Sequence, residues 1–211
     1  MMSKQKVMST TVYLDAAASA LKSKSVINAE VDFLKYHYAN AGRGVCMRAE
    51  LVDKMVNDAR TSVAKFINAD LESIIFTSGT TDGLNRVCRI LEKSSALNPA
   101  SVVMVSDLDH HSARMPWQEF AKQGKCKIKI CPLDNGNNLY PYDTKDKIDV
   151  FVITAMSNVL GAGQNVKKLI KWAKGINPKV ITIVDAAQYV AHLPIDVATV
   201  SYTHLAIGIC I

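Results

Sequence analysis

The chain has 211 residues, of which 49% are hydrophobic, so it is long enough and apolar enough to bury the core of one large domain. Its net charge is +6, but the lysines are scattered rather than gathered in a basic stripe, which argues against nucleic-acid binding. No apolar run is long enough to span a bilayer, and residues 1–10 lack an apolar signal core, so we expect a cytoplasmic protein without a membrane partner.

Five cysteines are present, and no two of them have the CxxC spacing of a zinc site or a redox dithiol. An odd number of cysteines without a secretion signal indicates free thiols. We therefore expect neither a structural metal nor disulfides.

The N-terminal part has two segments with apolar residues at helical spacing, residues 26–38 and residues 47–68. A loop with two glycines, residues 40–44, separates them and carries Arg43. An arginine in such a loop is either a solvated cation or a ligand for a carboxylate or phosphate, and the sequence leaves both readings open.

Residues 73–76 are expected to form a short strand, and residues 77–83 then lead into a helix over residues 84–91. A strand followed by glycine, hydroxyl groups and a helix start is typical of a phosphate site, because backbone N–H groups and hydroxyls can face one anion there. The alternative is an ordinary helix cap by Thr80 or Thr81. No Gly-Lys-Ser/Thr follows, so the segment is not a Walker loop.

The next strand is expected at residues 102–105, and the sequence Asp-His-His-Ser follows it at residues 109–112. Two histidines could ligate a metal, but no third ligand lies near them in the sequence. An imidazole that stacks on a planar cofactor fits this position better. A helix is expected from Pro116 to about Lys122, and a half-exposed strand over residues 125–130.

Two short apolar runs, at residues 151–155 and 180–184, flank a helical pattern at residues 166–174. Asn158 follows the first run, while Asp185 and Gln188 follow the second. Strands that alternate with helices predict an α/β fold with a mostly parallel sheet covered by helices on both faces. Ligands of such sheets bind just beyond the carboxyl ends of the strands, where these polar residues fall.

Six segments in this order resemble the class V aminotransferases, which are pyridoxal-phosphate enzymes of fold type I, and among them the SufS-like cysteine desulfurases. The resemblance covers residues 12 to 197. It is carried by Tyr-Leu-Asp-Ala-Ala-Ala at 13–18, Arg-Gly at 43–44, Phe-Thr-Ser-Gly-Thr-Thr-Asp-Gly-Leu-Asn at 76–85, Asp-His-His-Ser at 109–112, Ser-Asn-Val-Leu-Gly at 157–161 and Val-Asp-Ala-Ala-Gln at 184–188.

The resemblance implies a bound pyridoxal 5'-phosphate held by Gly79, Thr80, Thr81, His110, Asn158, Asp185 and Gln188. The first three would hold the phosphate, and His110 would stack on the pyridine ring with His111 beside it. Asp185 would pair with the protonated ring nitrogen, although a carboxylate that only caps its strand end is the alternative. Gln188 would contact the ring hydroxyl. Asn158 would contact the same side or the substrate carboxylate, and Arg43 would bind substrate at the entrance.

The family also has a Schiff-base lysine shortly after its Val-Asp-x-Ala-Gln strand, whereas here no lysine or arginine follows Lys179. None of the five cysteines matches the family's persulfide-forming nucleophile, so no catalytic residue is identified, and we expect these residues alone to be inactive. We expect a fold-type-I large domain truncated before its C-terminal domain, with an N-terminal arm and helix (1–45), an incomplete cofactor-binding domain (46–200) and a divergent tail (201–211). A short protein that has lost catalysis is the alternative.

The resemblance implies conversion of L-cysteine to L-alanine plus enzyme-bound persulfide sulfur, as used in iron–sulfur cluster assembly. Other class V reactions stay open, namely selenocysteine lysis, kynureninase-like hydrolysis and aminotransfer, as does a non-catalytic module that binds cofactor or a partner. A homodimer is implied, and a sulfur-acceptor protein is an open second partner.

Overall fold

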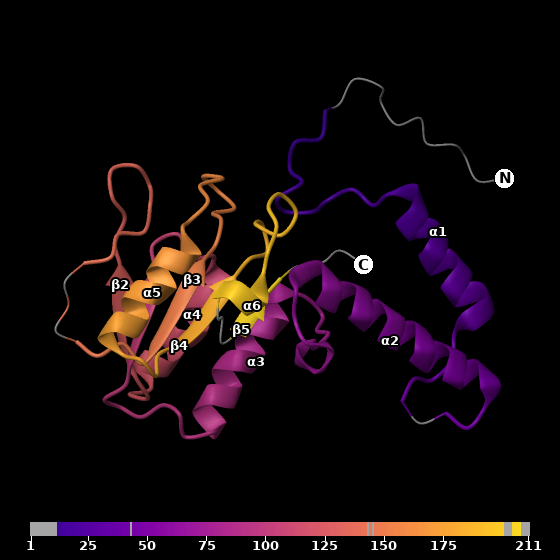
Figure 1. Cartoon of the computed structure of the whole chain (residues 1–211), viewed down its shortest axis with the longest axis horizontal. Helices are drawn as coiled ribbons and strands as arrows, with labels where there is room; N and C mark the ends of the chain where they lie inside the picture. Colours follow the sequence, from indigo (N-terminus) through magenta and orange to yellow (C-terminus); the bar gives the residue numbers. More distant parts are fainter. Residues whose placement is uncertain (1–11, 43, 143, 145, 201–203, 208–211) are drawn as a thin grey trace.

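The computed structural model describes residues 12–42, 44–142, 144, 146–200 and 204–207, and within these ranges one parallel sheet organises the chain (Figure 1). The strand order is β2-β1-β3-β4-β5, and every neighbouring pair is parallel. The strands are β1 (Val102–Ser106), β2 (Lys127–Cys131), β3 (Val150–Thr154), β4 (Ile181–Asp185) and β5 (His204–Ala206). The predicted α/β fold with a parallel sheet is confirmed.

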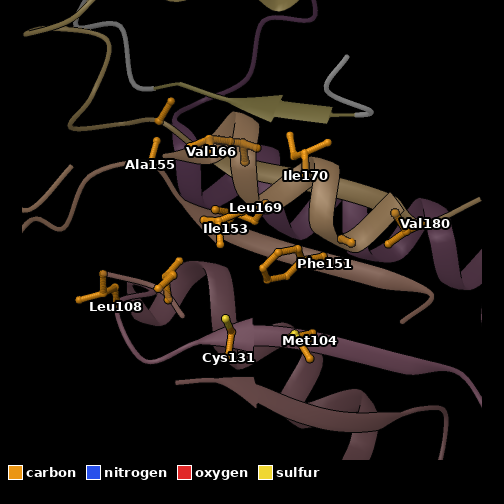
Figure 2. Packing of buried hydrophobic residues seen from close by; sticks show 14 of the residues in the cluster. Met104, Leu108, Cys131, Phe151, Ile153, Ala155, Val166, Leu169, Ile170 and Val180 are labelled. Atoms are coloured by element: carbon orange, nitrogen blue, oxygen red, sulfur yellow. The ribbon is translucent and has the colours of Figure 1, made fainter. Parts of the chain in front are cut away.

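Helices cover both faces of this sheet, as the sequence predicted. Because side chains alternate along a strand, Met104 points into one core and its neighbours Val103 and Val105 into the other. On the first face lies α5 (Val166–Ile176), whose apolar side chains point toward Phe151 and Ile153 (Figure 2). The second face is covered by α3 (Thr80–Lys93) and α4 (His111–Lys122).

The N-terminal helices lie to one side of the sheet (Figure 1). The first, α1 (Lys24–Asp32), continues as a π-helix, η1 (Phe33–His37), and neither contains a buried residue. The long α2 (Met47–Ile67) reaches the sheet domain with its C-terminal end, where Ile67 joins the core and Asn68 ends the helix in the left-handed conformation.

Two short helices complete the described chain, η2 (Leu71–Ser73) and α6 (Val197–Val200). No helix in the described ranges is both long and apolar enough to cross a membrane.

The strand order reverses between β1 and β3. From β1 the chain continues to β2 on one side of the sheet, whereas from β3 it continues to β4 on the opposite side. At this switch point the pairing is short: Val103 pairs with Val150 and Met104 with Phe151, whereas β3 and β4 stay paired as far as Thr154 and Asp185. The carboxyl ends of β1 and β3 are therefore not joined by the ladder. Open α/β sheets bind their ligands at such a point.

Two sequence-based expectations about local structure were wrong. The strand expected at residues 73–76 does not form: Ser73 ends a short helix and Ile74 is extended, but no strand in the described part of the chain pairs with the segment, and Ile75 is 76% exposed. The helix expected from Pro116 begins at His111, because the His110 side chain caps it there and Pro116 is accommodated inside it.

Candidate active site at the carboxyl edge of the sheet

Asp185 ends β4 at the carboxyl edge of the sheet. Asp185 is only 6% exposed, and its Oδ1 accepts a hydrogen bond of 3.0 Å from the Ala187 N–H. Burial raises the pKa of the Asp185 carboxyl, and the hydrogen bond from Ala187 and the charge of His110 act in the opposite direction. The structure thus brings Asp185 and His110 within electrostatic reach, although 74 residues separate them in the sequence.

His110 precedes the first residue of α4 and caps that helix with its ring. Its Nδ1 accepts a hydrogen bond from the Ser112 N–H (3.2 Å) and lies 2.7 Å from the Ser112 hydroxyl. These contacts fix the orientation of the ring while the residue stays exposed to solvent. The ring of His111 lies beside it, with 6.1 Å between the ring centroids. A fixed and accessible imidazole can stack on a flat ligand.

Helix α3 directs its N-terminal end toward the same edge. Its other end lies at the amino edge of the sheet, because Glu92 pairs there with Lys125, just before β2 begins. Gly79 caps the helix with a φ of +144°, and a Cβ built on it would meet nothing within 4 Å. The N–H groups of a first helical turn have no partner inside the helix. With Thr80 and Thr81 in that turn, this end can receive an anion.

The three remaining predicted site residues are Gln188, Asn158 and Arg43. Gln188 follows Asp185 by three residues, and its Nε2 donates a 2.9 Å hydrogen bond to the Ala17 carbonyl of the N-terminal arm. Asn158 is exposed in the turn after β3. Arg43 lies outside the described residues, so its role as a substrate ligand stays a prediction.

The sequence reading missed a buried polar group below the site. Asp109 is 7% exposed, and its carboxylate accepts hydrogen bonds from the Ser106 N–H (2.8 Å), the Ser106 hydroxyl (2.8 Å) and the Thr154 hydroxyl (2.7 Å). A carboxylate directly before a histidine pair, after a buried strand that ends in serine, was the available signal.

A cavity of about 490 Å³ opens on the side of the sheet that carries α5. It touches this edge through Ala155 and Ala186 and extends between the start of α5 and residues 193–196. None of the predicted cofactor residues lines it. The arrangement of Asp185, His110 and the start of α3 identifies the candidate site better than this hollow, because those residues carry charge and hydrogen-bonding groups suited to a ligand. Among the described residues, no group of three His, Cys, Asp or Glu side chains could hold a metal ion.

Comparison with known proteins agrees with this architecture. The profile of the family described as aminotransferase class-V matches residues 12–208. The cysteine desulfurase of Pectobacterium carotovorum is 33% identical over 190 residues, covering 88% of this chain and 46% of the relative. The cysteine desulfurase SufS of Plasmodium falciparum is 33% identical over 192 residues, covering 88% of this chain and 35% of the relative.

Among solved structures, the apo cysteine desulfurase from Thermococcus onnurineus superimposes with a TM-score of 0.85 at 30% identity. The match covers 93% of this chain and 49% of that one. The chain thus spans about half or less of the length of these relatives. The family's enzymes depend on pyridoxal phosphate. With 197 residues matched in order and the fold shared, the chain belongs to the class-V aminotransferase family.

Proposed function

We propose that this chain forms the pyridoxal-phosphate-holding part of a cysteine desulfurase, which converts L-cysteine to L-alanine and leaves the sulfur as an enzyme-bound persulfide. The observation that carries the proposal is the buried carboxylate of Asp185, which lies at the carboxyl edge of a parallel sheet within electrostatic reach of His110. The names of the relatives supply the choice of cysteine as substrate.

The residues present fit this cofactor. A buried carboxylate suits a protonated ring nitrogen, since the buried charge needs a cationic partner. The open start of α3, with Gly79, Thr80 and Thr81, suits a phosphate. The fixed ring of His110 would stack on the pyridine ring, and Gln188 would give its amide to the ring hydroxyl in place of the Ala17 carbonyl. Asn158 would contact cofactor or substrate, and Arg43 would hold the substrate carboxylate.

When bound, pyridoxal phosphate supplies an electron sink for a carbanion at the substrate Cα. In this scheme Asp185 would hold the proton of the ring nitrogen. His110 would stack on the ring and help to exclude water from it. The start of α3 would hold the phosphate.

Catalysis also needs an amine that binds the cofactor covalently and transfers protons, and the sequence contains no lysine after Lys179. We therefore propose that these 211 residues bind the cofactor but form no alanine from cysteine. A non-catalytic module that binds cofactor or a partner protein is the alternative from a different functional class. Selenocysteine, kynurenine and amino-donor substrates stay open as alternatives within the family.

We further propose that the protein forms a homodimer, acts in the cytoplasm and delivers sulfur to an acceptor protein for iron–sulfur cluster assembly. Support for an additional protein surface comes from large apolar side chains of the N-terminal segment that stay exposed, among them Val12, Leu14, Leu21, Val45 and Met47. Exposed apolar patches of this kind mark protein interfaces. Light scattering of the purified chain tests dimer formation, and a monomer at all concentrations would contradict it.

Absorbance titration of the purified chain with pyridoxal phosphate, followed by borohydride reduction, tests the cofactor proposal. We expect saturable binding, weaker binding of pyridoxal without its phosphate, and no single lysine trapped by reduction. Equal affinity for both compounds would contradict a phosphate site at α3. Alanine formed from L-cysteine would show that another group replaces the missing amine, which would overturn the predicted inactivity.

A further inference from the structure

The buried Asp109 carboxylate lies where the sheet divides. The ladder between β1 and β3 pairs Val103 with Val150 and Met104 with Phe151, and the strand ends beyond these pairs are linked through side chains. Asp109 makes this link, because it accepts hydrogen bonds from Ser106 at the end of β1 and from Thr154 at the end of β3. Three hydrogen bonds to one buried carboxylate hold the two ends at a fixed separation.

Both linked ends lead directly to residues of the proposed cofactor site. Asp109 is followed in the chain by His110, and Thr154 lies opposite Asp185 in the register of β3 and β4. The Ala155 N–H also donates a 2.8 Å hydrogen bond to the Asp185 carbonyl. A change in the contacts of Asp109 would therefore move the imidazole on one side and the β4 carboxylate on the other.

We propose that Asp109 is a positioning residue of this site, which holds His110 and Asp185 in register across the divided sheet and places a second negative charge below the cofactor ring. The inference rests on the proposed function for its ligand, but the coupling of the two carboxylates does not depend on cofactor.

The electrostatics of the surrounding groups agree with this role. Burial raises the pKa of the Asp109 carboxyl to about 6, the three hydrogen bonds lower it in part, and the Asp185 carboxylate raises it. Because repulsion between like charges is mutual, an ionised Asp109 also disfavours a negative charge on Asp185. Cys131 on β2 is a second titratable group close to Asp109, whose charge adds to the burial that raises the pKa of this thiol to about 12.

The chain offers a matched control at the opposite end of the same two strands. Asp149 precedes β3 and joins it to β1, since its Oδ2 accepts a 3.0 Å hydrogen bond from the Val102 N–H. Asp149→Asn thus alters a carboxylate that links β1 and β3 far from the carboxyl edge. Asp109→Asn and Asp149→Asn together separate positioning at the site from general support of the sheet.

The first measurement uses the chain without cofactor and follows the side-chain carboxyl carbons by NMR as a function of pH. We expect the pKa of Asp185 to fall in Asp109→Asn, because a neighbouring negative charge is removed, and to stay unchanged in Asp149→Asn. Thr154→Val keeps the charge of Asp109 but removes one hydrogen bond to it, so the pKa of Asp109 should rise. This variant keeps the inference testable if Asp109→Asn fails to fold.

The second measurement compares the dissociation constants for pyridoxal phosphate of Asp109→Asn and wild type between pH 5 and pH 7.5. We expect their ratio to rise from near one to about tenfold as Asp109 ionises, the size expected for a lost charged hydrogen bond. The titration of the cofactor phosphate cancels in this ratio. Asp149→Asn should give a ratio near one throughout.

The two measurements separate failure of the inference from failure of the proposed function. An unchanged Asp185 pKa in Asp109→Asn, or a ratio that is constant with pH, would overturn the positioning role even if wild type binds cofactor. If wild type bound no pyridoxal phosphate while the Asp185 pKa still fell, the carboxylate coupling would stand and the cofactor proposal would fail.

Discussion

Asp109 is also the residue whose titration should be visible in stability. Its pKa is raised from an ordinary 3.8 to about 6 in the folded chain, so the folded state holds a proton that the unfolded state has already lost. The free energy of unfolding should therefore decrease as pH rises between these two values, with the contribution of Asp109 constant outside that window.

Thermal unfolding of wild type and Asp109→Asn at a series of pH values measures this effect. Asn carries no titrating group, so the difference in melting temperature between variant and wild type should change across the window and become flat above it. Asp185 is also buried with a raised pKa. Because that pKa is expected to fall in Asp109→Asn, its contribution does not cancel, but it changes the difference between the two proteins in the same direction as the loss of the Asp109 titration. A difference that is flat from pH 4 to pH 7 would mean that Asp109 is not buried as described.

At the scale of residues, the sequence predicted the ends of the strands well and the interior of the site poorly. Asp185 was predictable because a polar residue ends a β-branched apolar run, which places it at the edge of a parallel sheet. Asp109 was not, because its partner Thr154 is 45 residues away and reads as part of an apolar run. A side chain that spans two strands leaves no periodic signal in either of them.

At the scale of elements, the start of α3 depends on a backbone conformation that suits glycine alone. Gly79 has φ +144° and ψ 175°, a region that side chains avoid because of clashes with the backbone. Gly79→Ala should lower the free energy of unfolding by about 1–3 kcal/mol, even though the space around it is open. Urea unfolding measures this change.

A second glycine provides the matched control. Gly175 lies in α5, and a Cβ at that position would also meet nothing within 4 Å, but its φ is not in the positive range. Gly175→Ala should stabilise the chain by about 0.5–1 kcal/mol, because alanine has the higher helix propensity. If both substitutions changed stability in the same direction, the conformation assigned to Gly79 would be wrong.

The periodicity of apolar residues predicted where helices occur in this chain more reliably than it predicted the residue at which each helix begins. Residues 26–38, 47–68 and 166–174 were placed correctly, since each has a long apolar stripe. The predicted start of α4 lies five residues too late, because proline commonly occupies the first turn of a helix, whereas here the His110 side chain caps the helix more than one turn earlier. The strand expected at residues 73–76 failed because β-branched residues permit an extended backbone but do not supply a pairing partner.

At the scale of the whole molecule, stability should depend on the sheet and its two covering layers rather than on the N-terminal helices. Phe151 lies in β3, the central strand of the sheet, is fully buried and contacts Trp172 of α5 edge to face, with 5.7 Å between ring centroids. Phe151→Ala should cost about 3–5 kcal/mol in the free energy of unfolding, which is the usual range for a buried phenylalanine.

Phe66, near the end of α2, is 62% exposed and serves as the control. Phe66→Ala should change the free energy of unfolding by no more than about 0.5 kcal/mol in the monomer. Chemical unfolding of both variants under the same conditions makes the comparison. A large loss in Phe66→Ala would show that α2 packs against the domain more extensively than the structure indicates.

The fold class, the family and the dependence of that family on pyridoxal phosphate all follow from the sequence, because six short motifs fall in one order along alternating strands and helices. The divisions at residues 45 and 200 stay a prediction, as does the identity of the substrate. Substrate choice depends on side chains that approach the ligand, and these are set by long-range packing rather than by local pattern.

We propose that Asp185 holds pyridoxal phosphate at the carboxyl edge of this sheet, and equilibrium binding to wild type, Asp185→Asn and Asp134→Asn tests this role. Asp134 is a hydrogen-bonded carboxylate in an exposed turn and controls for the loss of a charge elsewhere. We predict a dissociation constant about 10- to 100-fold higher for Asp185→Asn, because a buried charged contact is lost. Asp134→Asn should bind as wild type does. Equal affinity in all three proteins, or no binding by wild type, would contradict the claim.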